Sequence, residues 1–120
     1  MITRVFVYGT LKRGCCNHHW ISAQRFVGEA ETEAVYRMYD AGGFPALVAD
    51  EKTGVAIQGE LWDVDENGLA KLDVLEGVAV GEYERVPCRL SPAISETPVQ
   101  IYLWLLSTAG MAEIGACWTE

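Results

Sequence analysis

The sequence predicts an α+β fold, with a compact mixed β-barrel-like sheet of about five to seven strands and flanking helices. Three observations predict it. Short segments rich in β-branched and aromatic residues recur between glycine, proline and aspartate turns. One segment has the apolar spacing of an amphipathic helix, and a shorter segment follows a capping residue. The strands and helices do not alternate regularly, which disfavours repeated βαβ units.

The length of 120 residues predicts a single domain over residues 1–120. Nine basic and seventeen acidic residues give a net charge of -8, which disfavours nucleic acid and anionic membranes as partners. No apolar stretch approaches the roughly 20 residues of a membrane span, and the N-terminus lacks the apolar block of a signal peptide. We therefore expect a cytoplasmic protein whose partner is a small molecule. These features do not specify its oligomeric state.

The first elements follow from β-rich residues and glycines. Residues 3–8 are predicted to form a strand that ends at Gly9. Residues 10–14 then form a loop between two glycines. A short helix is expected over residues 17–24, with Asn17 as its N-cap.

Alternation and turn residues predict the next elements. Glutamates at every second position give residues 25–39 the pattern of a half-exposed strand. A turn at 40–43 leads into a brief strand at 45–48. A hairpin turn at 50–54 then precedes a strand at 55–64, where apolar residues again alternate.

A helix is predicted to begin after Asp65, its N-cap, and to end at about Glu76, with Gly77 just beyond it. Residues 83–90 are expected to form a strand that Pro87 places near an edge or bulge.

Three segments complete the chain. Residues 91–98 are rich in turn formers. Residues 99–106 are apolar on both faces, as in a strand that is buried on both sides. The last fourteen residues are weakly patterned, and we expect them to pack loosely.

Glu76 is an unusual residue for its position. It lies on the apolar stripe of the predicted helix, below Leu69 and Leu72, and at the helix end where the macrodipole disfavours a carboxylate. Burial and the helix end both raise a carboxyl pKa, and such a group can exchange protons near neutral pH. The alternatives are a surface glutamate at a frayed helix end or a structural partner of Arg85. Asp73, on the same stripe, fits a structural carboxylate held by Arg85, Arg89 or backbone amides.

The loop after the first strand is a candidate ligand site. Gly9 and Gly14 have the spacing of a phosphate-binding loop, but the Lys that must follow is absent. A glycine at a strand end lets a ligand approach the backbone, whose amides can hold a carboxylate or carbonyl oxygen. The alternative is a plain strand-to-helix turn. Four basic residues and no acid precede Glu29, a balance compatible with a small anionic ligand or with chance.

The cysteines do not indicate a disulfide framework, because the chain is neither cysteine-dense nor secretory in pattern. Residues 15–19 read Cys-Cys-Asn-His-His, but adjacent pairs converge poorly on a tetrahedral metal ion. A Cys–His nucleophilic pair would lack a third, orienting group. We therefore do not expect a metal site here.

Taken in order, the motifs of residues 5–105 resemble those of the gamma-glutamylcyclotransferase-like family. No single motif is decisive, whereas their order and spacing together are fairly specific. The matching segments are Val7–Gly14 (VYGTLKRG), Asn17-His18, Gly43–Val48 (GFPALV), Val55–Trp62 with Gly59-Glu60-Leu61, Leu72–Gly77 (LDVLEG), Tyr83-Glu84-Arg85 and Tyr102.

The resemblance implies a mixed barrel and a cavity where the loop faces the helix-end glutamate. It implies a cofactor-independent enzyme that cyclises a γ-glutamyl amine or γ-glutamyl amino acid to 5-oxoproline and releases the amine. By position, Glu76 matches the catalytic glutamate, acting as general acid and base, and Tyr83 matches a cavity tyrosine. The residues that match the loop binding the glutamyl group are Tyr8, Gly9, Thr10 and Leu11.

Two other functions remain open from the sequence. The same pocket could serve a non-catalytic module that binds a small carboxylate-bearing metabolite. A different amide-cleaving or amide-transferring reaction on a tailored amine is a third hypothesis.

Overall fold

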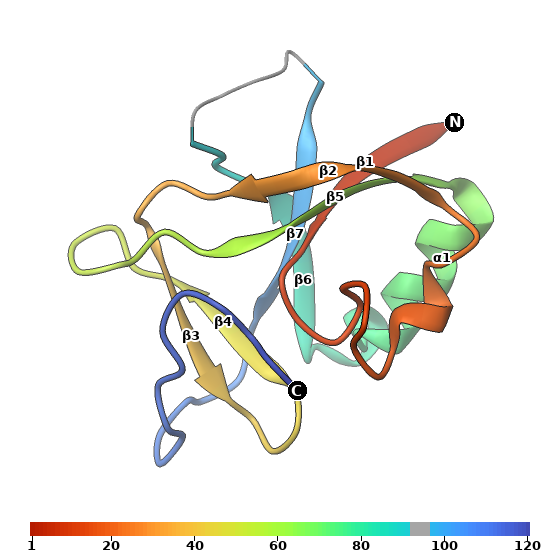
Figure 1. Ribbon diagram of the computed structural model, residues 1–120. Helices are drawn as coiled ribbons and strands as arrows, with labels where there is room; N and C mark the ends of the chain where they lie inside the picture. Colours follow the sequence, from red (N-terminus) through yellow and green to blue (C-terminus); the bar gives the residue numbers. More distant parts are fainter. Residues whose placement is uncertain (92–96) are drawn as a thin grey trace.

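The computed structural model describes residues 1–91 and 97–120, which form two sheets and three helical segments (Figure 1). The strands are β1 (Ile2–Val7), β2 (Arg25–Glu31), β3 (Tyr36–Asp40), β4 (Pro45–Ala49), β5 (Gln58–Asp65), β6 (Tyr83–Pro87) and β7 (Val99–Trp104). The helical segments are α1 (Glu66–Leu75) and the 3-10 turns η1 (His18–Trp20) and η2 (Val78–Val80).

The larger sheet has the strand order β2-β5-β1-β7-β6, and β3 pairs with β4 in the smaller one. Strands β1 and β7 are parallel, while the other ladders are antiparallel. The predicted mixed α+β fold is therefore confirmed, but the larger sheet is not a closed barrel. Within the described residues its edge strands β2 and β6 share no ladder, and their continuations meet in a single isolated bridge between Thr32 and Leu90.

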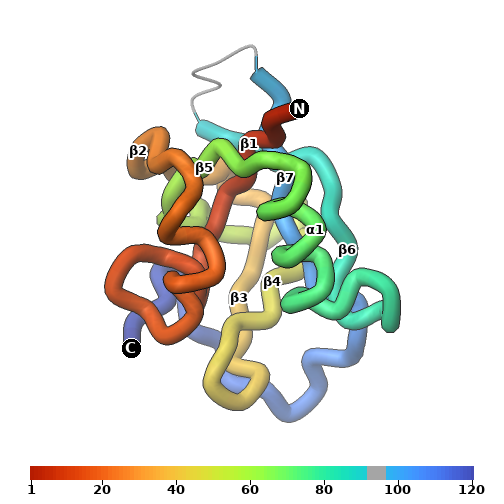
Figure 2. The backbone as a smooth tube through the Cα atoms, turned by 90° about the vertical axis from the view of Figure 1, so that its right-hand side faces the viewer, coloured from red at the N-terminus to blue at the C-terminus, as the bar shows by residue number. Residues whose placement is uncertain are grey.

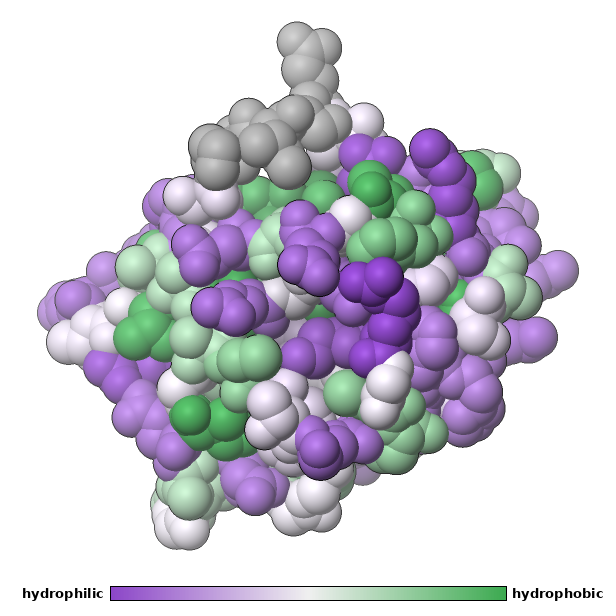
Figure 3. Space-filling model, in the orientation of Figure 1, coloured by the Kyte–Doolittle hydropathy of each residue, from purple (hydrophilic) through white to green (hydrophobic). Residues whose placement is uncertain are grey.

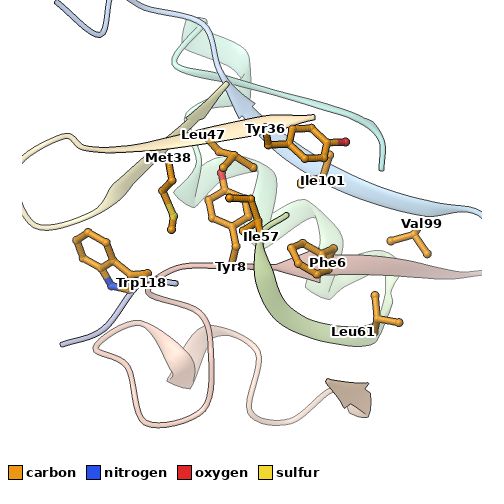
Figure 4. Close-up of a cluster of buried hydrophobic side chains, with 10 residues drawn as sticks. All are labelled: Phe6, Tyr8, Tyr36, Met38, Leu47, Ile57, Leu61, Val99, Ile101 and Trp118. Carbon is orange, nitrogen blue, oxygen red and sulfur yellow. The ribbon is translucent and has the colours of Figure 1, made fainter. Parts of the chain in front are cut away.

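Alternation along β1 divides the core between two layers, because successive side chains of a strand point to opposite faces. Val5 and Val7 pack with Leu72 of α1, which covers one face of the larger sheet (Figure 2). Phe6 and Tyr8 point the other way, toward the β3–β4 hairpin, and Figure 4 shows the Tyr8 ring in that cluster. The end of β1 thus lies between both layers.

Helix α1 begins and ends as the sequence predicts. Asp65 is its N-cap, and its Oδ1 accepts a hydrogen bond from the Gly68 amide at 2.6 Å. Glu76 is the C-cap residue, and its amide donates to Leu72 O at 2.9 Å. Gly77 follows with φ +64°, a left-handed conformation that favours glycine.

The single strand predicted for residues 25–39 is wrong, because the chain leaves the larger sheet after β2 and enters the smaller one at β3. Thr32 makes this crossing. It is fully buried, its hydroxyl donates to Glu33 O at 2.7 Å, and the same oxygen accepts from the Ile57 amide at 2.9 Å. A threonine that satisfies backbone groups in this way competes with a regular ladder.

Two further predicted elements are shorter in the structure. The helix expected over residues 17–24 is only the 3-10 turn η1, and the Asn17 side chain makes no capping bond there. The strand expected from Val55 begins at Gln58, and Val55 instead forms an isolated bridge with Tyr36. The predicted turn-rich segment 91–98 lies largely outside the described residues, since 92–96 are not among them.

The loose packing expected for the last fourteen residues is wrong. Trp118 is buried in the same cluster as Tyr8 and Met38, and the segment runs beside β3 and β4 (blue in Figure 1). The Ile114 amide donates to Met38 O at 2.9 Å, and the Gln58 amide donates to Ala116 O at 2.8 Å. Trp118 thus anchors the tail to the core, although the tail contains no regular element with a readable period.

The face of the molecule seen in Figure 3 is largely hydrophilic. Figure 3 shows hydrophilic side chains spread over one face, with hydrophobic ones in small separate groups. Within the described residues, no helix is both long and apolar enough to cross a membrane.

Candidate active site

A cavity of about 250 Å³ lies where the loop after β1, the start of β4 and the end of α1 meet. Every site residue predicted from the sequence lines it: Tyr8, Gly9, Thr10, Leu11, Glu76 and Tyr83. The other lining residues are Phe6, Val7, Asn17, Gly43, Phe44, Pro45, Leu75, Glu82 and Tyr102. The structure thus brings together distant parts of the chain: Tyr8 and Glu76, which both line the cavity, are 68 positions apart.

Glu76 is a half-buried carboxylate that has no counter-charge within the part of the chain that the structure describes. Among the described residues, none donates a hydrogen bond to its side chain or forms an ion pair with it. Burial, and then the nearby carboxylate of Glu82, raise its pKa from 4.5 to about 7. Arg85, one of its predicted alternative partners, instead holds Asp73, with Nε to Oδ1 at 3.0 Å and Nη2 to Oδ2 at 3.2 Å.

Glu60 shows what a partner does to a buried carboxylate in the same molecule. It is 7% exposed, and it accepts hydrogen bonds from the Arg13 amide at 3.1 Å, Arg13 Nε at 3.0 Å and Trp62 Nε1 at 3.1 Å. Burial alone would raise its pKa, but the hydrogen bonds from Arg13 and Trp62 outweigh burial and hold the pKa below its usual range. The raised pKa of Glu76 therefore follows from burial without donors.

The loop after β1 closes a turn in which the Lys12 amide donates to Gly9 O at 3.1 Å. Within the described chain, no residue accepts a hydrogen bond from the backbone amides of Thr10 and Leu11. Both residues are buried and line the cavity. Their amides are the donors with which the site could hold a carboxylate or an oxyanion.

Gly9 is required by packing. A Cβ at this position would lie 2.4 Å from Pro45 Cγ and 2.9 Å from Pro45 Cδ. Pro45 therefore fills the space beside the Gly9 Cα, and the glycine does not open this space to a ligand. This contact brings β4 against the loop and gives the cavity one of its walls.

The basic residues near the N-terminus are used to fix this loop and its strands, and none of them lines the cavity. Lys12 Nζ donates to Trp118 O at 2.7 Å, and Arg13 binds Glu60. Arg4 and Arg25 both bind Asp63. Their positive charge therefore has a structural role. It does not mark an anion site built from basic side chains.

Asn17 is a cavity residue whose side chain the sequence assigned to a helix cap. Its Nδ2 donates to Thr10 Oγ1 at 3.0 Å, and its amide donates to Thr10 O at 2.9 Å. These bonds fix Thr10 in place while leaving the hydroxyl proton of Thr10 available to another acceptor. The resemblance had already included this asparagine among the matching motifs.

Three tyrosines form rigid walls. Tyr8 donates to Tyr102 O at 2.6 Å, and Tyr83 donates to Pro45 O at 2.5 Å. The Tyr102 hydroxyl donates to Asp73 Oδ1 at 2.7 Å. Burial raises the pKa of Tyr8 and of Tyr83 above the usual range, so these hydroxyls keep their protons. Those protons are committed to protein acceptors, and the rings shape the cavity.

The Cys-Cys-Asn-His-His segment contributes a structural contact. His18 Nδ1 donates to Leu11 O at 2.9 Å, and its ring lies 5.3 Å from that of Trp62. The described residues contain no group of three or more His, Cys, Asp or Glu that could hold a metal ion. All four cysteines, which lie within the described residues, are free thiols.

Residues 5–119 match the family model described as gamma-glutamyl cyclotransferase, AIG2-like. An inferred gamma-glutamylcyclotransferase of Vibrio cholerae is 44% identical over 81 residues, which cover 68% of this chain and 67% of that protein. One of Drosophila melanogaster, also inferred, is 39% identical over 113 residues, covering 88% of this chain and 71% of that protein. The crystal structure of an AIG2-like protein from Mus musculus gives a TM-score of 0.72 at 26% identity, covering 96% of this chain and 87% of that one.

Proposed function

The chain belongs to the AIG2-like gamma-glutamyl cyclotransferase family, and from that premise we propose that it cyclises a γ-glutamyl amine or γ-glutamyl amino acid to 5-oxoproline. One observation carries the proposal. A half-buried carboxylate, which has no hydrogen-bond or ion-pair partner among the described residues, lines the same cavity as two backbone amides that have no acceptor in that part of the chain. The first group suits proton transfer near neutral pH, and the second suits an anion.

Glu76 acts as general base and then as general acid in this proposal. It accepts a proton from the α-ammonium of the substrate, and the freed amine attacks the γ-carbonyl carbon. The new carbon–nitrogen bond gives a tetrahedral oxyanion. Collapse of this intermediate breaks the bond from the γ-carbon to the leaving nitrogen, which takes up the proton held by Glu76. The ring nitrogen then loses its second proton through Glu76 to the released amine, which leaves as an ammonium ion. A pKa near 7 allows one carboxyl group to perform both transfers.

The loop residues bind the glutamyl group. Amides of Thr10 and Leu11, with the Thr10 hydroxyl, hold the α-carboxylate or stabilise the oxyanion. The tyrosine walls restrict the chain to a bent conformation, and because ring closure is intramolecular, this restriction supplies a large share of the rate. The residues of the chain perform each of these steps, and the proposal needs no cofactor.

The test is a panel of γ-glutamyl compounds with 5-oxoproline as the readout. Wild-type protein should form 5-oxoproline, and Glu76→Gln, which keeps the shape and removes the exchangeable proton, should lose at least a hundredfold in kcat, in line with general acid–base catalysis. Glu66→Gln, an exposed residue at the other end of the same helix, is the matched control and should keep full activity.

Two outcomes would contradict the proposal. One is a Glu76→Gln variant that is folded and as active as wild type. The other is a panel without turnover. In that case a shift in melting temperature with 5-oxoproline would assign the cavity to a non-catalytic module that binds a carboxylate-bearing metabolite.

A further inference from the structure

The charges that line the cavity are of one sign. Two carboxylates, Glu76 and Glu82, are among its lining residues, and no lysine, arginine or histidine is among those the structure describes there. Glu82 forms no hydrogen bond or ion pair to a basic side chain within the described chain. A ligand in the cavity therefore meets an unneutralised negative charge.

Glu82 is directed toward the catalytic end of α1 by local backbone geometry. Its amide donates to Gly77 O at 3.1 Å. Its carboxylate folds back over Gly77, where a Cβ would lie 2.9 Å from Glu82 Oε2. The glycine that ends the helix thus leaves the space into which this side chain leans. Glu82 is exposed to solvent, so its charge lies at the mouth of the cavity.

The exposure of the lining residues distinguishes the closed end of the cavity from its mouth. Tyr8, Thr10 and Leu11 are at most 9% exposed, and in the proposed function they hold the glutamyl group. Phe44 is 37% exposed, and Glu82 is also exposed. A substrate whose glutamyl end is buried therefore places its leaving amine beside Phe44 and Glu82.

We propose, on the basis of the proposed function, that Glu82 determines leaving-group specificity. It favours a leaving amine that carries a second positive charge, and it disfavours one that carries a carboxylate. The preferred substrates are then γ-glutamyl derivatives of diamines or similar cationic amines, and γ-glutamyl amino acids are poor substrates. Phe44 offers an apolar surface for the aliphatic stem that joins the two nitrogens.

Three probes of equal length isolate this charge. They are the γ-glutamyl derivatives of a linear diamine, of the neutral alkylamine and of the ω-amino acid. An exposed charge pair changes an affinity about two- to fivefold. Repulsion of a carboxylate adds to attraction of a cation, so wild-type kcat/KM should fall about tenfold from the first probe to the third.

The variants separate the charge of Glu82 from other effects. Glu82→Gln should bring the three kcat/KM values close together, and Glu82→Lys should reverse their order. Glu84→Gln and Glu84→Lys change the net charge equally on an exposed residue of β6 that does not line the cavity. These controls should keep the wild-type order.

Each failure has its own meaning. Turnover of the probes with an order that Glu82→Lys leaves unchanged would overturn this inference and leave the proposed function intact. An equal change of order in the Glu84 variants would assign the effect to net charge and would also overturn it. Absence of 5-oxoproline from all three probes with wild-type protein would overturn the proposed function and this inference with it.

Discussion

Replacing Glu76 by glutamine should stabilise the folded protein above neutral pH while it removes the proposed base. In the folded state burial holds the carboxyl pKa at about 7, against an ordinary value of 4.5. A solvated carboxyl in the unfolded chain ionises near that ordinary value. Between these two values the unfolded chain releases a proton that the folded protein keeps. The free energy of unfolding therefore falls as the pH rises through this interval.

The size of the effect follows from the shift. A rise from 4.5 to about 7, at about 1.4 kcal/mol per unit, corresponds to about 3 kcal/mol. This contribution is present at pH 4, where the side chain is protonated in both states, and it is lost by pH 8.5. Glutamine resembles the protonated acid and does not ionise. The variant should therefore gain about 3 kcal/mol over wild type between the two pH values.

Urea unfolding of both proteins at pH 4 and pH 8.5 measures this difference. Most other titrating groups are shared by the two proteins, so the change in their stability difference with pH reports on position 76. The same gain should appear as a rise of about 12 °C in the relative melting temperature, given the unfolding entropy of a chain of this length. Glu66→Gln serves as the control and should show no such pH-dependent gain.

A stability difference that does not change between pH 4 and pH 8.5 would refute this reasoning. It would mean that the Glu76 carboxyl ionises in the folded protein as it does in the unfolded chain. The site would then lack a carboxyl poised near neutral pH, and the general-base role would lose its physical support even if the protein were active.

Three other predictions test the site and its supports. Glu76 must be ionised to accept a proton and its pKa is about 7, so kcat/KM should fall below about pH 7. Glu82→Gln should move this fall to lower pH, because it removes a neighbouring negative charge. An acidic limb of the pH profile that does not move in Glu82→Gln would contradict the electrostatic interaction between Glu76 and Glu82. Gly9→Ala, whose Cβ would lie 2.4 Å from Pro45 Cγ, should lower stability by about 1–3 kcal/mol in urea unfolding and reduce turnover, whereas an unchanged variant would show that the wall can move. Trp118→Ala should cost about 3–5 kcal/mol in the same assay, and a cost below about 1 kcal/mol would return the tail to the loosely packed segment that its sequence indicates.

Local patterns in the sequence predicted the parts of the fold that depend on neighbouring residues. Asp65 and Gly77 set the two ends of α1 because capping is decided within one turn. The strand around Val5 follows from its β-rich composition and the strand around Leu61 from alternation, and both signals act over a few residues. Glu76 could be singled out because a carboxylate on an apolar stripe conflicts with its surroundings even before the fold is known.

The remaining features depend on contacts between distant segments. The burial of Trp118 results from packing against β3, which no local period reports. The crossing at Thr32 depends on Ile57, because the Ile57 amide donates a hydrogen bond to the threonine hydroxyl. The reason for Gly9 is Pro45, which lies 36 positions away in the chain. In each case the sequence shows the residue type but does not show which distant residue it contacts.

Partners also explain why Glu60 and Glu76 differ in pKa. Both glutamates stand next to apolar residues in the sequence; Glu60 is buried and Glu76 is half-buried. Arg13, brought back by the loop after β1, gives Glu60 the donors that keep it ionised, and this ion pair fixes the loop. The described residues that line the cavity include no cation for Glu76, and Glu82 adds a second negative charge. Glu60 thereby helps to build the site, whereas Glu76 has the raised pKa that the proposed proton transfer requires.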